Sequence, residues 1–220
     1  MRTSPHPLYP VFLELSGTPV LVVGGGEVAL RKVGTLLECG AHVTVISPEI
    51  HADLAALVKR KAGSARVLRR KFRTSDLSRR WRMVVAATHH AEFNARIGAA
   101  CRRKGIWVNV VSPPDAGDVQ IPSAIRHGRF CVAFSTGGSS AALAATVRGH
   151  VEKTLGPEWG VLCDILSARR EKIQRSIADP SKRSALLQKL GGRRWVLAVK
   201  RHGRKKAEQL IDREIGRCVQ

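Results

Sequence analysis

Short apolar runs alternate with amphipathic stretches through the first half of the chain. The apolar runs, rich in β-branched residues, predict strands at residues 19–23, 42–47, 66–68, 83–87 and 106–111. Between them, apolar residues at helical spacing predict helices at residues 27–38, 51–61 and 91–104, and a turn or short helix begins at Thr74. Such an alternation predicts a doubly wound α/β domain built on a parallel sheet.

The pattern changes after residue 111. Residues 112–118 form a loop rich in turn residues, and the following apolar run predicts a strand at residues 130–135. A loop of small residues at 136–140 then leads into a helix at 141–154. That loop either binds an anion through its N–H groups or simply caps the helix. From Trp159 onward the chain is predicted to be mostly helical, with breaks at 179–180 and 191–192.

A glycine motif stands between the first strand and the first helix. It reads Gly24-x-Gly26-x-x-Ala29, the dinucleotide-binding pattern in its G-x-G-x-x-A form. Gly24 permits a tight turn, Gly26 lets the backbone approach a diphosphate, and Ala29 lets the helix pack closely on the strand. The helix N-terminus then offers N–H groups to the phosphates. The alternative interpretation is a structural turn without a ligand.

The second strand is followed by an acid that supports the same interpretation. In many dinucleotide-binding folds an acid after this strand binds the adenosine ribose. Glu49, in the sequence Ser47-Pro48-Glu49, is the candidate here, and no arginine follows at once. The sequence therefore favours NAD over NADP.

The charge of the chain is strongly positive. Its 220 residues include 38 Lys and Arg against 17 Asp and Glu, a formal net charge of +21, with eleven basic residues and one acid between Lys59 and Arg82. This field attracts polyanions such as nucleic acid, a membrane surface or a polycarboxylate substrate. Few aromatic residues accompany the basic runs, so a stacking platform for single-stranded nucleic acid is not indicated. A solvated basic surface is the alternative.

Several other classes are disfavoured. No apolar run reaches about 18 residues and the N-terminus lacks the apolar core of a signal peptide, so we expect a cytoplasmic protein without a membrane span. Five widely separated cysteines suggest neither a disulfide framework nor a zinc site, and no metal site is predicted.

Six segments together resemble the precorrin-2 dehydrogenase family, which also forms the amino-terminal module of siroheme synthase. Their order and spacing match over about residues 8–155, and the last 65 residues resemble the family's helical extension only loosely. The segments are residues 9–15, 22–32, 85–88, 108–111, 121–124 and 135–140.

This resemblance implies a fold, an activity and a set of site residues. The family oxidises precorrin-2 to sirohydrochlorin with NAD⁺ in a homodimer, and some members also insert Fe²⁺. Its fold implies a Rossmann NAD-binding domain at 1–112, a dimerisation segment at 113–150 and a small basic helical domain at 151–220. The substrate is a tetrapyrrole with eight carboxylates, which gives the positive charge a use. The implied cofactor contacts are Gly24, Gly25, Gly26, Glu27, Val28, Pro48, Glu49 and Thr88.

The chain departs from the family pattern after the fifth strand. Ser112 stands where members usually carry an Asp, the favoured acid–base residue. A hydroxyl accepts no proton near neutral pH without a base beside it, so the role is either dispensable or moved. Asp118, which matches a second acidic position of the family, and then Asp115 are the candidate catalytic carboxylates; both are otherwise turn formers. We expect dehydrogenase activity without efficient ferrochelation.

A second departure is His89-His90, where the family commonly has acids. The pair either binds a metal or shuttles a proton, or is simply exposed. Two other functions stay open at this point. The chain could be a family member that binds NAD or a tetrapyrrole without turnover, or a nucleic-acid-binding protein on the same scaffold. The second of these rests on charge alone.

Overall fold

The computed structural model describes residues 7–219, which form two compact units. The first unit ends at Ile121 and the second begins at Pro122. Within the described residues, no helix is long and apolar enough to cross a membrane. Each unit has its own core, and each is described separately below.

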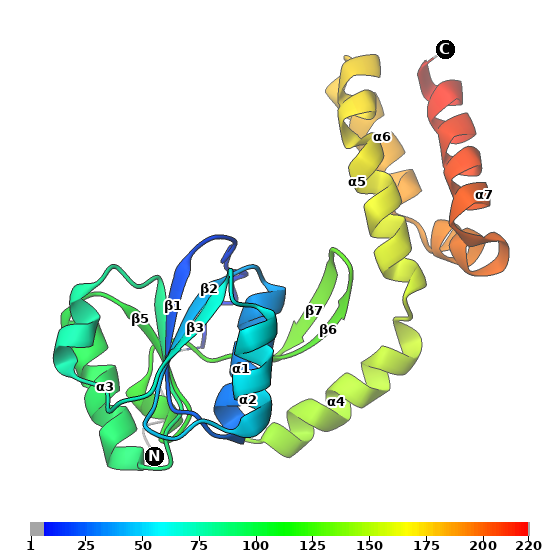
Figure 1. Ribbon diagram of the computed structural model, residues 1–220. Helices are drawn as coiled ribbons and strands as arrows, with labels where there is room; N and C mark the ends of the chain where they lie inside the picture. The colour runs from blue at the N-terminus through cyan, green and yellow to red at the C-terminus, as the bar shows by residue number, and fades with distance from the viewer. Residues whose placement is uncertain (1–6, 220) are drawn as a thin grey trace. The chain divides into compact units, whose positions relative to one another are not determined.

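The first unit is built on a five-stranded parallel sheet (Figure 1). Its spatial order is β3-β2-β1-β4-β5, so β1 lies at the centre and the strand order reverses between β1 and β4. The predicted doubly wound α/β fold is confirmed. The strands are β1 (Pro19–Val23), β2 (His42–Ile46), β3 (Ala65–Leu68), β4 (Met83–Ala86) and β5 (Trp107–Val110).

Helices cover both faces of this sheet (Figure 1). Because side chains alternate along a strand, Val20 and Val22 of β1 pack with α1 (Glu27–Glu38) and α2 (Ala52–Arg60). Leu21 and Val23 pack on the other face with α3 (Ala91–Arg103) and the short 3₁₀ helix η1 (Thr74–Ser78). The strands are therefore buried on both faces, which is why their sequences are apolar runs rather than alternating patterns.

The second unit joins a β-hairpin to a set of helices. The hairpin pairs β6 (Ser123–His127) with β7 (Phe130–Phe134) around Gly128, whose φ is +60°. The sequence predicts β7 but misses β6. The helices that follow are α4 (Ala141–Thr154), α5 (Glu158–Ser176), α6 (Pro180–Leu190) and α7 (Arg193–Val219), the last broken at Gly203 with φ +74°.

Close packing ties the hairpin to α5. A Cβ on Gly160 would lie 2.1 Å from the carbonyl oxygen of His127, so this contact requires glycine, and the rings of Phe130 and Trp159 stack with centroids 5.8 Å apart. Helices α5, α6 and α7 share a separate apolar core that includes Ile165, Ile173, Leu190, Ile211 and Ile215. The hairpin thus belongs to the same compact unit as the C-terminal helices. The predicted three-part division, with its own dimerisation segment, stays a prediction.

Candidate functional site

The glycine turn after β1, Gly24–Gly26, packs closely against the backbone that follows β2 and β4. Gly24 has φ +125°, and a Cβ there would lie 2.3 Å from the carbonyl oxygen of Ala87. A Cβ on Gly25 would lie 2.0 Å from the carbonyl oxygen of Glu49. The amide of Gly24 also donates to the carbonyl of Ile46 at 3.0 Å. Both glycines are therefore required by packing, and Gly24 also by its backbone conformation.

Helix α1 begins directly after this turn with an open N-terminus. Gly26 is its N-cap residue in an extended conformation, and no side chain caps the helix. The N–H groups of the first turn, at Glu27, Val28 and Ala29, thus lack intrahelical partners and carry the positive end of the helix dipole. Ala29 is fully buried, which brings the helix close to the sheet. These groups fit the diphosphate of a dinucleotide.

The turn lies where the strand order reverses, between β1 and β4. In open α/β sheets, ligands bind beyond the carboxyl ends of the strands at this switch point. Pro48 and Glu49 follow β2 at the same edge, both exposed, and the amide of His51 donates to the carbonyl of Gly25 at 2.8 Å. The structure therefore brings Glu49 beside the glycine turn, the place expected for a ribose-binding acid.

Asn94, which belongs to none of the sequence motifs, links the ends of β4 and β5. Its Oδ1 accepts from the amide and from Oγ1 of Thr88, at 3.1 and 2.7 Å. Its Nδ2 donates to the carbonyl oxygens of Thr88 and Ser112, at 3.0 and 3.2 Å. Asn94 is fully buried. It positions the backbone at the two strand ends that border the switch point.

The two histidines after Thr88 differ in their surroundings. A Cβ on Gly26 would lie 3.3 Å from Nε2 of His89, so the His89 imidazole stands against the glycine turn. His90 is the N-cap residue of α3. No group of three or more His, Cys, Asp or Glu side chains in the part of the chain that is described is arranged to hold a metal ion. The geometry thus places His89, rather than the pair, beside the expected cofactor.

The loop after β5 separates the three candidate catalytic residues. Ser112 lies at the carboxyl end of β5, where its carbonyl joins the Asn94 network. Asp115 is in the short 3₁₀ helix η2 (Pro114–Ala116), which packs against α3. The chain then folds back, so that the amide of Asp118 donates to the carbonyl of Val108 at 2.9 Å.

Asp118 consequently lies beside the first half of β5 rather than at its carboxyl end. Its Oδ1 is 3.9 Å from the Arg102 guanidinium near the end of α3. It also faces buried Cys101, whose pKa is raised to about 12 by burial and, secondarily, by the charge of Asp118. Ser112 is thus the candidate that shares the Asn94 network with Thr88. The acid–base roles of all three residues stay predictions.

Residues 11–123 match the family model described as "Putative NAD(P)-binding". The chain belongs to this family. The expected dinucleotide cofactor is thereby confirmed at the level of an NAD(P)-binding domain. The match covers both the glycine turn and the loop after β5.

Individual relatives agree with the resemblance drawn from the sequence. The chain is 40% identical over 174 residues to siroheme synthase of Methylococcus capsulatus, covering 79% of this chain and 36% of the relative. It is 35% identical over 204 residues to siroheme synthase 3 of Aeromonas hydrophila, covering 92% of this chain and 43% of the relative. The chain therefore spans about two fifths of the length of these curated relatives.

A solved structure is similar over its whole length. The structure of SirC, a precorrin-2 dehydrogenase, superposes with a TM-score of 0.71 at 28% identity, covering 94% of this chain and 100% of that chain. The resemblance to the precorrin-2 dehydrogenase and siroheme synthase family is confirmed.

Proposed function

We propose that this protein is an NAD-dependent dehydrogenase that oxidises precorrin-2 to sirohydrochlorin in the cytoplasm. The observation that carries the proposal is the glycine turn at the switch point, on a fold similar throughout to the precorrin-2 dehydrogenase SirC. NAD⁺, when bound, supplies the hydride acceptor. The protein's part is then to bind both molecules and hold them aligned.

The residues divide this work among them. The open N-terminus of α1, at Gly26, Glu27 and Val28, binds the diphosphate through backbone N–H groups. Glu49, beside Gly25, accepts hydrogen bonds from the ribose hydroxyls, and this carboxylate disfavours a 2′-phosphate. Asn94 keeps Thr88 in place at the end of β4.

Ser112 shapes the expected range of activities. Hydride transfer depends mainly on placement, so it tolerates a hydroxyl in place of a carboxylate. Insertion of Fe²⁺ must release two pyrrole protons, and Ser112 has no capacity to take them near neutral pH without a base beside it. We therefore propose inefficient ferrochelation, with Asp115 and Asp118 as the remaining carboxylates of this loop.

The second candidate function is binding without turnover, and the observation that favours it is also Ser112. The chain would then hold NAD or a tetrapyrrole as a sensor or carrier. Titration calorimetry with NAD⁺ and NADP⁺, followed by anaerobic oxidation of precorrin-2, separates the two functions. The dehydrogenase binds NAD⁺ more tightly than NADP⁺ and turns over. Binding of NAD⁺ with no oxidation would favour the carrier.

We also propose that the protein is a homodimer joined through α4. No residue of this 14-residue helix is buried. Leu143 and Val147, one turn apart on the same face, are 54% and 37% exposed. An exposed apolar helix face of this kind is typical of an interface with another protein surface.

Sedimentation velocity tests the dimer with matched variants. Leu143→Glu with Val147→Glu introduces two charges into the α4 face and is expected to yield monomers. Leu187→Glu is the control, because Leu187 is 41% exposed on α6 and lies outside that face. A wild-type monomer, or a dimer that survives the α4 substitutions, would contradict the proposed interface.

A further inference from the structure

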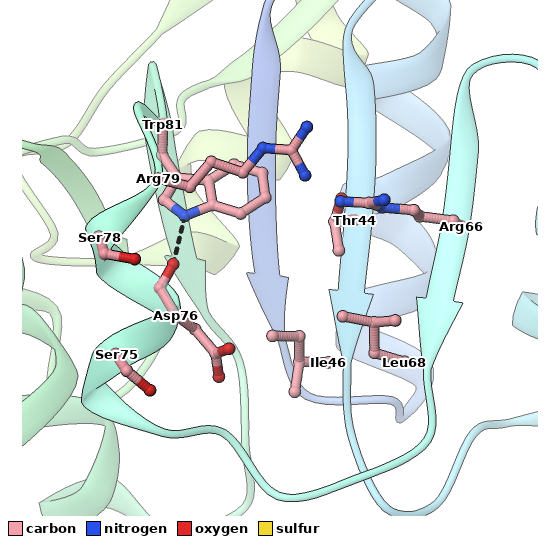
Figure 2. A pocket seen from close by; sticks show the side chains of 9 residues that line it. All are labelled: Thr44, Ile46, Arg66, Leu68, Ser75, Asp76, Ser78, Arg79 and Trp81. Carbon is pink, nitrogen blue, oxygen red and sulfur yellow. Dashed lines mark hydrogen bonds between the residues drawn. The ribbon is translucent and has the colours of Figure 1, made fainter.

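A cavity of about 220 Å³ lies on the face of the sheet that α3 and η1 share, over β2 and β3. Figure 2 shows it from close by, with η1 on one side and β3 on the other. Its lining combines an apolar part with several polar side chains. The lining residues are Thr44, Ile46, Arg66, Leu68, Ser75, Asp76, Ser78, Arg79 and Trp81.

Two arginines reach into this cavity from opposite sides. Arg66 extends from β3 and Arg79 from the residue after η1, and Figure 2 shows the Arg66 guanidinium beside Thr44 and the Arg79 side chain extending toward the sheet from the η1 side. Among residues 7–219, neither arginine forms an ion pair with a carboxylate. Both side chains are exposed, so their positive charges are open to an anion from solvent.

The one acid in the lining does not balance these charges. Asp76 is held by Arg70, whose two terminal nitrogens donate to its two carboxylate oxygens at 2.8 and 2.6 Å. This pairing with Arg70, together with the amide of Arg73, lowers the pKa of Asp76 from its usual range. Asp76 and Arg70 therefore neutralise each other. The cavity retains the two positive charges of Arg66 and Arg79.

Both arginines are held in place by their neighbours. Arg66 donates from Nε to Oγ1 of Thr44 at 3.1 Å, and Thr44 is only 5% exposed. The Arg79 guanidinium carbon lies 5.5 Å from the ring centre of Trp81. The Trp81 indole is itself fixed, because its Nε1 donates to the carbonyl of Asp76 at 2.8 Å. These supports lower the entropy that the arginines lose on binding a ligand.

We propose that this cavity binds the phosphate group of a small phosphate monoester. A phosphate dianion has three free oxygens in a tetrahedral arrangement, which matches two guanidinium groups from different directions better than a planar carboxylate does. Ser78, which lines the same pocket from η1, adds a hydroxyl donor. Leu68, which is only partly buried, provides an apolar surface for the organic part of the ligand. The site does not depend on the dehydrogenase function.

Phenyl phosphate is the probe, titrated into the full-length protein by calorimetry at constant ionic strength. Replacing Arg66 and Arg79 together by Gln is expected to weaken binding roughly 10-fold or more, since each removes a charge-assisted contact. The matched control is Arg80→Gln with Arg82→Gln, which removes the same charge next to the cavity but outside its lining. The control should retain wild-type affinity. Arg66→Lys with Arg79→Lys keeps the charge and should give an intermediate loss.

Each remaining outcome would overturn the proposal. Equal weakening in both Gln pairs would mean that only the overall positive field attracts the probe. Equal affinity for malonate would assign the site to carboxylates instead of phosphate esters. Displacement of phenyl phosphate by NAD⁺ would make the cavity part of the dinucleotide site. Circular dichroism of the Gln pair, unchanged from wild type, establishes that a loss of binding is not a loss of fold.

Discussion

Asn94 provides a quantitative test of how the site is held together. Its side chain is fully buried and makes four hydrogen bonds, three with Thr88 and one with the carbonyl of Ser112. Asn94→Ala removes all four and leaves the Thr88 amide and two carbonyl oxygens without these partners. All four bonds are partly buried, so losing one costs more than losing a fully exposed hydrogen bond.

The expected cost follows from these contacts. Net contributions of about 0.5–1.5 kcal/mol per hydrogen bond, with two of the bonds sharing Oδ1, give a loss of roughly 2–4 kcal/mol in the free energy of unfolding. With a urea dependence of about 2 kcal/mol per molar, the unfolding midpoint should fall by roughly 1–2 M. The same substitution should weaken NAD⁺ binding, because Thr88 and Ser112 are no longer fixed at the switch point.

Urea titration followed by circular dichroism measures the first effect, and calorimetry with NAD⁺ measures the second. Thr35→Ala is the control: Thr35 is exposed on α1 and makes one side-chain hydrogen bond, to the carbonyl of Arg31 at 3.2 Å, so it should cost less than about 0.5 kcal/mol. An Asn94→Ala midpoint within error of the Thr35→Ala midpoint would refute this account of Asn94.

Three further predictions test other parts of the structure. Arg70 lowers the pKa of Asp76 below its ordinary value of 3.8. The Asp76 carboxylate therefore stabilises the fold above about pH 3.8, and this contribution is lost as the pH falls through the folded-state pKa. The urea midpoint of Asp76→Asn should accordingly fall less than that of wild type when the pH is lowered. Ser112→Asp should leave precorrin-2 oxidation largely unchanged and raise the rate of Fe²⁺ insertion; a large gain in oxidation rate would count against the proposed division of roles. Cys101 has a pKa of about 12 and no exposed surface, so it should resist iodoacetamide in the folded protein and react in urea. Peptide mass mapping measures this alkylation, and ready alkylation without urea would contradict the burial of Cys101.

Much of the first unit can be predicted from the sequence because its signals are local and agree with one another. The apolar run at 19–23, the glycines after it and the helical spacing at 27–38 give β1, the turn and α1 with the observed bounds. The helix at 141–154 is likewise predicted with the bounds of α4. In each case the strand or helix leaves a continuous local pattern that a single sequence displays.

Features that depend on distant partners are harder to predict. The Ser-Ala-Ile-Arg-His sequence of β6 has one fully buried residue, Ile125, so neither an apolar run nor a clear alternation marks it as a strand. Its partner is β7, with which it forms the two-stranded sheet. The paired strand, rather than the sequence of β6, determines the structure there.

The site residues likewise differ in whether their positions follow from local sequence patterns. Asn94 shares the buried face of α3 with Ile97 and Cys101, at spacings of three and four residues, and a polar residue on such a stripe was the available signal. The position of Asp118 depends on a loop that turns back along β5, which residue types alone do not specify. Sequence spacing therefore identified the carboxylates of the loop but not their places relative to the ends of the strands.

The most direct test of the proposed function is the anaerobic oxidation of precorrin-2 by the purified protein, with NADH and sirohydrochlorin measured together in the presence and absence of NAD⁺. We expect the two products to rise in step, one NADH for each sirohydrochlorin, and only when NAD⁺ is present. A protein that binds NAD⁺ yet forms neither product would contradict the dehydrogenase and leave a carrier of NAD or tetrapyrrole in its place.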